Sequence, residues 1–199
     1  MGKEAEPYEK NEAYEDWKKA FGKKYDELVE QRLDGEPTPY ILFSPEWAKK
    51  FEEEIQRSAK YQKLAKGWKG SVVLQILAKP EIGFENDLYL FIDIFNGDCY
   101  SVRLVPKEVG ETGDYIIEGE YDRWKKIITG ELDVMVGLMT GKLKLAKREK
   151  LSMIVKYAFA AKELVVSAVR TKSSYPDELT PEELEKFKAM FKDLKEFGI

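Results

Sequence analysis

The chain of 199 residues contains no histidine and a single cysteine. Without histidine it lacks the imidazole that activates Ser or Cys nucleophiles and that commonly binds zinc. Hydrolases and zinc enzymes are therefore disfavoured, and we expect no catalytic centre, metal or other cofactor. Cys99 has no partner for an internal disulfide, which favours the reducing cytoplasm. It falls in an apolar run typical of a strand, so we expect it to be buried.

Long apolar runs and an excess of positive charge are also missing. No run approaches the ~20 residues that cross a bilayer, and the acidic N-terminus is unlike a signal peptide. The net charge is -4, with lysines and glutamates interleaved, so no nucleic-acid partner and no stable membrane insertion are expected. Many charges with few Asn and Gln residues fit a protein from a hot environment.

The first forty residues form a unit of their own in the sequence. Residues 11–33 carry aromatic and aliphatic side chains at helical spacing, among them Tyr14, Trp17 and Tyr25, which predicts an amphipathic helix. Gly35 and two prolines then break the pattern. We predict a helical extension and linker over residues 1–40 and a main domain over residues 41–199. Packing of this helix on its own domain is favoured over a homodimer contact or an arm for a protein partner.

The main domain begins with a helix and continues with strands. Ser44 and Pro45 are typical of a helix start, and the helix is predicted to reach residue 64. Four strands are expected at residues 71–78, 87–95, 99–105 and 115–121. The Asn-Gly pair at 96–97 predicts a hairpin between the second and third strands. The aliphatic face of residues 88–94 is expected to meet the helices.

The remaining third predicts two short helices, a strand and two longer helices. Residues 121–145 contain two apolar helical patterns that end at Gly130 and Gly141, with Asp122 and Asp133 as candidate N-caps, and then a strand over 142–145. A helix over 148–170 has an apolar stripe so broad that deep burial is expected. A last helix over 180–197 starts with a capping box. This order indicates an α+β domain in which helices cover one face of a mostly antiparallel, five-stranded sheet.

Residues 137–145, with the sequence GLMTGKLKL, resemble the core of the sterol carrier protein 2 (SCP2) family. Residues 124–133 are similar to the approach to that core, and the resemblance extends over residues 44–169. One departure is the segment 146–150, where many members have a glycine. The resemblance implies a sheet covered by helices, with an apolar tunnel that takes a sterol, fatty acid, acyl-CoA or isoprenoid-type lipid.

A set of bulky apolar side chains is then expected to line this tunnel. By spacing alone these residues are core predictions, and the resemblance, in which a late helix borders the ligand, makes them lining candidates. They are Trp124, Met135, Leu138, Met139, Phe159, Phe187, Met190 and Phe191.

Three functions remain open at this stage. The first is a non-enzymatic lipid carrier, and the second is an accessory or assembly subunit with the same fold and a filled core. The third is an enzyme that uses the pocket for acyl or hydrocarbon substrates, for which Asp93, Tyr115 and Glu118 are the faint candidates. The acidic residues at 118–131 and Lys142 and Lys144 are better explained as solvated faces of strands than as a cation or headgroup site.

Overall fold

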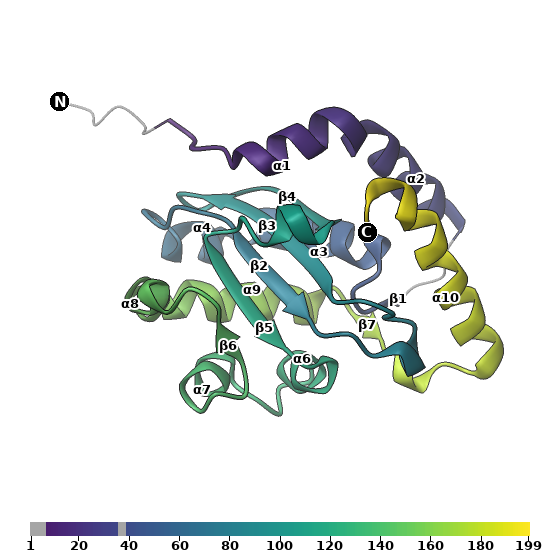
Figure 1. The fold of residues 1–199 in the computed structure, drawn as a ribbon. Helices are drawn as coiled ribbons and strands as arrows, with labels where there is room; N and C mark the ends of the chain where they lie inside the picture. The colour runs from purple at the N-terminus through teal and green to yellow at the C-terminus, as the bar shows by residue number, and fades with distance from the viewer. Residues whose placement is uncertain (1–6, 36–38) are drawn as a thin grey trace.

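A computed structural model of the protein describes residues 7–35 and 39–199 and has a five-stranded sheet at its centre (Figure 1). The strands are β1 (Tyr40–Ile41), β2 (Val72–Ile76), β3 (Leu88–Phe95), β4 (Asp98–Val105), β5 (Tyr115–Gly119), β6 (Lys144–Leu145) and β7 (Ser173–Ser174). The helices are α1 (Glu12–Trp17), a π-helical turn (Lys18–Gly22), α2 (Lys23–Gly35), α3 (Pro45–Arg57), α4 (Ala59–Leu64), α5 (Lys107–Gly110), α6 (Tyr121–Ile128), α7 (Val134–Met139), α8 (Leu151–Lys156), α9 (Ala158–Arg170) and α10 (Pro181–Leu194). Short 3-10 turns cover Pro80–Ile82, Arg148–Lys150, Pro176–Glu178 and Lys195–Phe197.

The sheet has the strand order β4-β3-β2-β5-β6, and only the β2–β5 pair is parallel. The predicted hairpin joins β3 to β4, and its two turn residues, Asn96 and Gly97, have φ of 53° and 94°. The fifth strand, β6, pairs with β5 at the sheet edge after α6 and α7. The α+β architecture and the mostly antiparallel sheet predicted from the sequence are confirmed. The two-residue pair β1–β7, which ties the start of α3 to the end of α9, was not predicted.

The two faces of β3 are both buried, but against different elements. Ile92, Val72 and Leu74 belong to the aliphatic face, which meets the helices α3, α6 and α9 as predicted. On the opposite face the ring of Phe91 lies under the N-terminal helix. The sheet is therefore sandwiched over β3, and the main helical layer lies on its aliphatic side (Figure 1).

Two helices that the sequence predicts as continuous are broken in the structure. The helix from residue 44 stops at Ser58 (φ -81°, ψ 90°), whose hydroxyl accepts from the Tyr61 amide to start α4 and donates to the buried Glu163 carboxylate. A serine that caps a new helix competes with continuation of the old one. The helix over 148–170 breaks at Tyr157, whose ring stacks on Trp68 with centroids 5.6 Å apart. Both single-helix predictions are wrong at these points.

The N-terminal helices pack on their own domain, as favoured from the sequence. The Tyr14 ring stacks on Phe91 with centroids 4.3 Å apart, and its hydroxyl lies 2.7 Å from Ser101 Oγ. Arg103 donates to the same hydroxyl at 2.7 Å and pairs with Asp26 of α2 at 2.8 Å. These contacts cover the aromatic face of the sheet, and the Tyr25 hydroxyl of α2 accepts a hydrogen bond from the Leu104 amide on the outer strand β4.

Asp93 gives this interface a dependence on pH. Its side chain is buried, accepts a hydrogen bond from the Tyr8 hydroxyl and lies 4.0 Å from Lys18 Nζ. Burial, which outweighs those two contacts, raises the pKa of Asp93 above its ordinary value. A carboxyl whose pKa is raised on folding stabilises the fold below its unfolded-state pKa of about 4 and loses that contribution as pH rises through the folded-state pKa.

We therefore expect Asp93→Asn to gain stability relative to wild type as pH rises from 3 to 7. The amide still accepts from Tyr8 but carries no charge to desolvate. The measurement is the free energy of unfolding in urea at several pH values, with Asp16→Asn, an exposed acid of the same region, as the control. A difference between Asp93→Asn and wild type that stays constant with pH would contradict this role.

Candidate functional site

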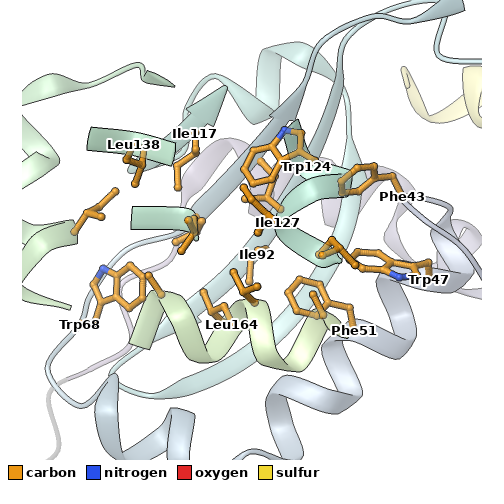
Figure 2. A pocket seen from close by; sticks show the side chains of 18 residues that line it. Phe43, Trp47, Phe51, Trp68, Ile92, Ile117, Trp124, Ile127, Leu138 and Leu164 are labelled. Atoms are coloured by element: carbon orange, nitrogen blue, oxygen red, sulfur yellow. The ribbon is translucent and has the colours of Figure 1, made fainter. Parts of the chain in front are cut away.

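An apolar cavity lies between the aliphatic face of the sheet and the helical layer (Figure 2). Figure 2 shows Trp68 and Leu138 at one end of the lining and Phe43 and Trp47 at the other, with Ile92 between them. The aromatic wall consists of Phe43, Trp47, Phe51, Trp68 and Trp124, and the sheet contributes Val72, Leu74, Ile92 and Ile117. The helical wall consists of Ile127, Ile128, Val134, Leu138, Ile154, Ala161, Leu164, Val165 and Ala168.

No lining residue carries a charge or a hydroxyl. The indole N–H groups of Trp47 and Trp124 are occupied by Ser173 Oγ at 2.8 Å and the Gln75 carbonyl at 3.4 Å. These two tryptophans therefore present their apolar ring surfaces, rather than their N–H groups, to the cavity. Such a lining binds by the hydrophobic effect, which rewards apolar area and has little directional selectivity.

The volume of the cavity is about 60 Å³. This is on the order of the space of two water molecules, whereas pockets for drug-sized ligands have about 300–1,000 Å³. The cavity is thus a gap in the packing between the sheet and the helical layer, too small in this conformation for a sterol or a fatty acid. A lipid would enter only if part of the wall moved outward.

Helix α7 is a short wall segment of the cavity that lies between two glycine turns. It is six residues long and lies between Gly130 and Gly141, whose positive φ values of 81° and 72° form tight turns. Neither glycine has another part of the chain within 4 Å of the place where a Cβ atom would stand. Val134 and Leu138 of α7 face the cavity. An outward movement of α7 would turn at these two glycines and would expose the buried side chain of Val134.

The N-terminus of α7 is fixed by Asp133, as predicted. Its carboxylate accepts from the amides of Met135 and Val136 at 2.9 and 3.1 Å and pairs with Lys162 of α9 at 2.8 Å. The hydrogen bond from Lys162, with those from the two amides, holds the pKa of Asp133 below its ordinary value. The other candidate cap, Asp122, does not cap α6. Residue 120 holds that position without a side-chain bond, and Asp122 pairs with Lys79 at 2.8 Å.

The eight predicted lining residues are not brought together by the fold. Trp124 and Leu138 line the cavity. Met135 is packed against the core beside it, while Met139 and Phe159 project into solvent. The remaining three belong to α10: Phe187 and Met190 line a separate groove toward α2, with charged residues in its wall, and Phe191 packs on Phe84 with centroids 5.6 Å apart.

The aromatic wall was missed as a site, although its positions follow simple rules. Trp47 and Phe51 are one turn apart on α3 and so point in the same direction. Phe43 precedes the Ser44 cap and has φ of 66°, a costly conformation for an aromatic residue that its buried ring stabilises by an edge-on contact with Trp47. Trp68 sits in a turn before β2, where no periodicity could have indicated its direction.

None of the three faint enzyme candidates lines the cavity. Asp93 is on the opposite face of the sheet, and Glu118 of β5 pairs with Lys144 of the edge strand β6 at 3.0 Å. Tyr115 packs edge-on against Trp68 with its ring under Lys150. Within residues 7–35 and 39–199, no group of three or more Cys, Asp or Glu side chains is placed to hold a metal ion.

Comparison with known proteins agrees with this fold. The model of the SCP-2 sterol transfer family matches residues 49–154. A crystal structure of sterol carrier protein 2 is 32% identical, with 64% of this chain and 97% of that chain covered and a TM-score of 0.59. A solution structure from Thermus thermophilus, of a conserved hypothetical protein described as a possible sterol carrier protein, is 30% identical, with 69% and 94% covered and a TM-score of 0.61. Among curated proteins, none matches the chain.

The family match extends over more than half of the chain and includes the sheet, α6, α7 and β6. This match supports lipid binding or transfer in general. The chain belongs to the SCP-2 sterol transfer family.

Proposed function

We propose that the protein is a non-enzymatic lipid carrier that holds an apolar molecule between the sheet and the helices α6 to α9. The observation that carries the proposal is the cavity itself, a gap lined by eighteen apolar side chains in a chain of the SCP-2 family. The ligand class that this lining favours is a long alkyl chain, a sterol or an isoprenoid, because each offers apolar area and few polar groups.

The affinity would come from burial. Removing about 300 Å² of alkyl surface from water contributes about 7 kcal/mol, from which the cost of immobilising the ligand and moving the wall is subtracted. Growth of the cavity is expected to proceed by outward movement of α7 and α8. The inner sides of these two short helices, at Val134, Leu138 and Ile154, already border the space.

The second candidate, an accessory subunit with a filled core, is favoured by the small volume of about 60 Å³. In that case the aromatic wall is ordinary packing and no ligand enters. The two functions differ in a single property, which is whether the helical layer yields to an apolar molecule.

The experiment is extraction and native mass spectrometry of the purified protein, followed by displacement of a fluorescent fatty acid. If the protein is a lipid carrier, we expect one lipid-sized adduct per chain and saturable binding of the fluorescent fatty acid, which unlabelled lipid displaces by competition. A folded protein that carries no adduct and takes up no probe would leave the accessory subunit as the better account.

A further inference from the structure

The outer side of the helical layer carries an unusual patch of apolar side chains. Of the nine large hydrophobic residues that are exposed in the described part of the chain, seven lie on α7, α8 and α9. Met139 and Phe159 are 70% and 74% exposed. Exposed apolar residues scattered singly need no explanation, but a contiguous group marks an interaction surface.

The patch follows from the outer sides of α8 and α9. Leu151 and Val155 are four residues apart on α8, and Phe159, Val166 and Val169 recur at seven and three residues along α9 and are also exposed. The inner stripe of Ile154, Ala161, Leu164 and Val165 borders the cavity. The sequence pattern predicted deep burial for the whole broad stripe, and this is wrong: only the inner half is covered.

Helix α7 extends the patch sideways. The ion pair between Asp133 and Lys162 holds α7 beside α9, and the exposed side of α7 presents Val136 and Met139. We call these seven side chains the outer patch: Val136, Met139, Leu151, Val155, Phe159, Val166 and Val169.

The charge around the outer patch is positive, against the net charge of the chain. Residues 142–172 contain nine lysines and arginines but only two glutamates, in a chain of net charge -4. One of those glutamates, Glu163, is buried and paired with Lys60 and Arg170, and Asp133 is paired with Lys162. Lys156, which lies over the ring of Tyr157, follows Val155 at the end of α8, and Lys162 lies three residues after Phe159 and four before Val166 on α9. Apolar residues with lysines around them are the pattern of a helix that lies in a membrane interface.

A second copy of the chain fits this surface poorly. A twofold contact would bring the same basic residues face to face, and like charges at an interface oppose association. Insertion is also not indicated, because none of the helices in residues 7–35 and 39–199 is long and apolar enough to cross a bilayer. The surface of an anionic bilayer offers negatively charged headgroups to the lysines and an acyl region to the apolar side chains.

We infer that the outer patch docks the protein on a membrane surface rich in anionic lipids, with α7 and α8 against the bilayer. The inference rests on the proposed function, because docking in this orientation sets the yielding wall of the cavity against the source of the ligand. Outward movement of α7 would then open the cavity toward the acyl chains rather than toward water.

The test is co-sedimentation of the full chain with phosphatidylcholine vesicles that contain or lack phosphatidylserine. Wild type is expected to bind the anionic vesicles at least about tenfold more tightly, with the difference lost in high salt. Phe159→Ser should weaken binding about tenfold. Lys156→Glu, a change of two charges, should weaken it about thirtyfold. Tyr100→Ser removes an aromatic side chain that is 44% exposed at the sheet edge, outside the outer patch, and should bind like wild type.

Binding of a fluorescent fatty acid without vesicles separates this inference from the proposed function. Phe159→Ser should keep wild-type affinity for the probe. Wild type that binds the probe but no vesicle, or Phe159→Ser that sediments like wild type, overturns the docking and leaves the carrier standing. Wild type that binds vesicles but not the probe would contradict the lipid-carrier function and support the outer patch as a membrane contact. A concentration-dependent dimer that Phe159→Ser abolishes would assign the patch to a second copy and overturn the docking.

Discussion

Tyr14→Ala is expected to lower the free energy of unfolding by about 3–5 kcal/mol, the largest loss of stability that we predict for a single substitution. The Tyr14 side chain is fully buried, stacks on Phe91 and shares hydrogen bonds with Ser101 and Arg103. Its removal leaves a cavity over the aromatic face of the sheet and withdraws a partner from the partly buried guanidinium of Arg103. The loss is measured by urea or guanidinium unfolding.

Two variants separate the parts of this effect. Tyr14→Phe keeps the stacked ring and should cost about 1–2 kcal/mol, the range for a buried hydrogen-bonding group that loses its partner. Glu12→Ala changes an exposed residue of the same helix and should stay within about 0.5 kcal/mol of wild type. If Tyr14→Ala were as mild as Glu12→Ala, the N-terminal helices would be a detachable arm, and the division of the chain at residue 40 would be a true domain boundary.

Ala161→Leu is expected to reduce the affinity for a fatty acid at least about tenfold while the fold is retained. Ala161 lies in the wall of the cavity, and the three added carbon atoms occupy the space that the ligand would enter. Because the cavity has about 60 Å³ free, the larger side chain is accommodated with at most about 1–3 kcal/mol of overpacking. The affinity is measured by displacement of a fluorescent fatty acid, and the fold by the unfolding transition.

Ala158→Leu is the matched control. It makes the same change three residues earlier on α9, at a partly exposed position that does not border the cavity. We expect it to bind fatty acid like wild type. Equal binding by wild type and both variants would place the ligand elsewhere on the molecule, for example in the groove between α2 and α10 that holds Phe187 and Met190.

The sequence was sufficient for the order of the main helices and strands and for the aliphatic face of the sheet. The Asn-Gly hairpin, the Asp133 cap and the alternation along β3 are local signals, and local signals survive in the fold. The helix breaks at Ser58 and Tyr157 could not be read in the same way. They depend on contacts with Glu163 and Trp68, far away along the chain.

The sequence identified the kind of residue that lines the site, but not the direction in which each side chain points. Apolar spacing identifies which residues share a helix face, but not which of two apolar faces meets the sheet. On α9 the predicted Phe159 belongs to the outer face, while Leu164 and Val165, five and six residues further on, belong to the cavity. Lining roles for Met135, Met139, Phe159 and the α10 residues remain predictions, as do the cytoplasmic location and the hot environment.

The most direct test of the carrier is energy transfer from tryptophan to a fatty acid with a conjugated polyene tail. Three of the four tryptophans, Trp47, Trp68 and Trp124, line the cavity, and the fourth, Trp17, lies on the other side of the sheet against Phe197. We predict saturable quenching at one fatty acid per chain that persists in Trp17→Phe and is lost in Ala161→Leu. Quenching that is absent in the folded wild type, or unchanged in Ala161→Leu, would contradict a lipid site between the sheet and the helices.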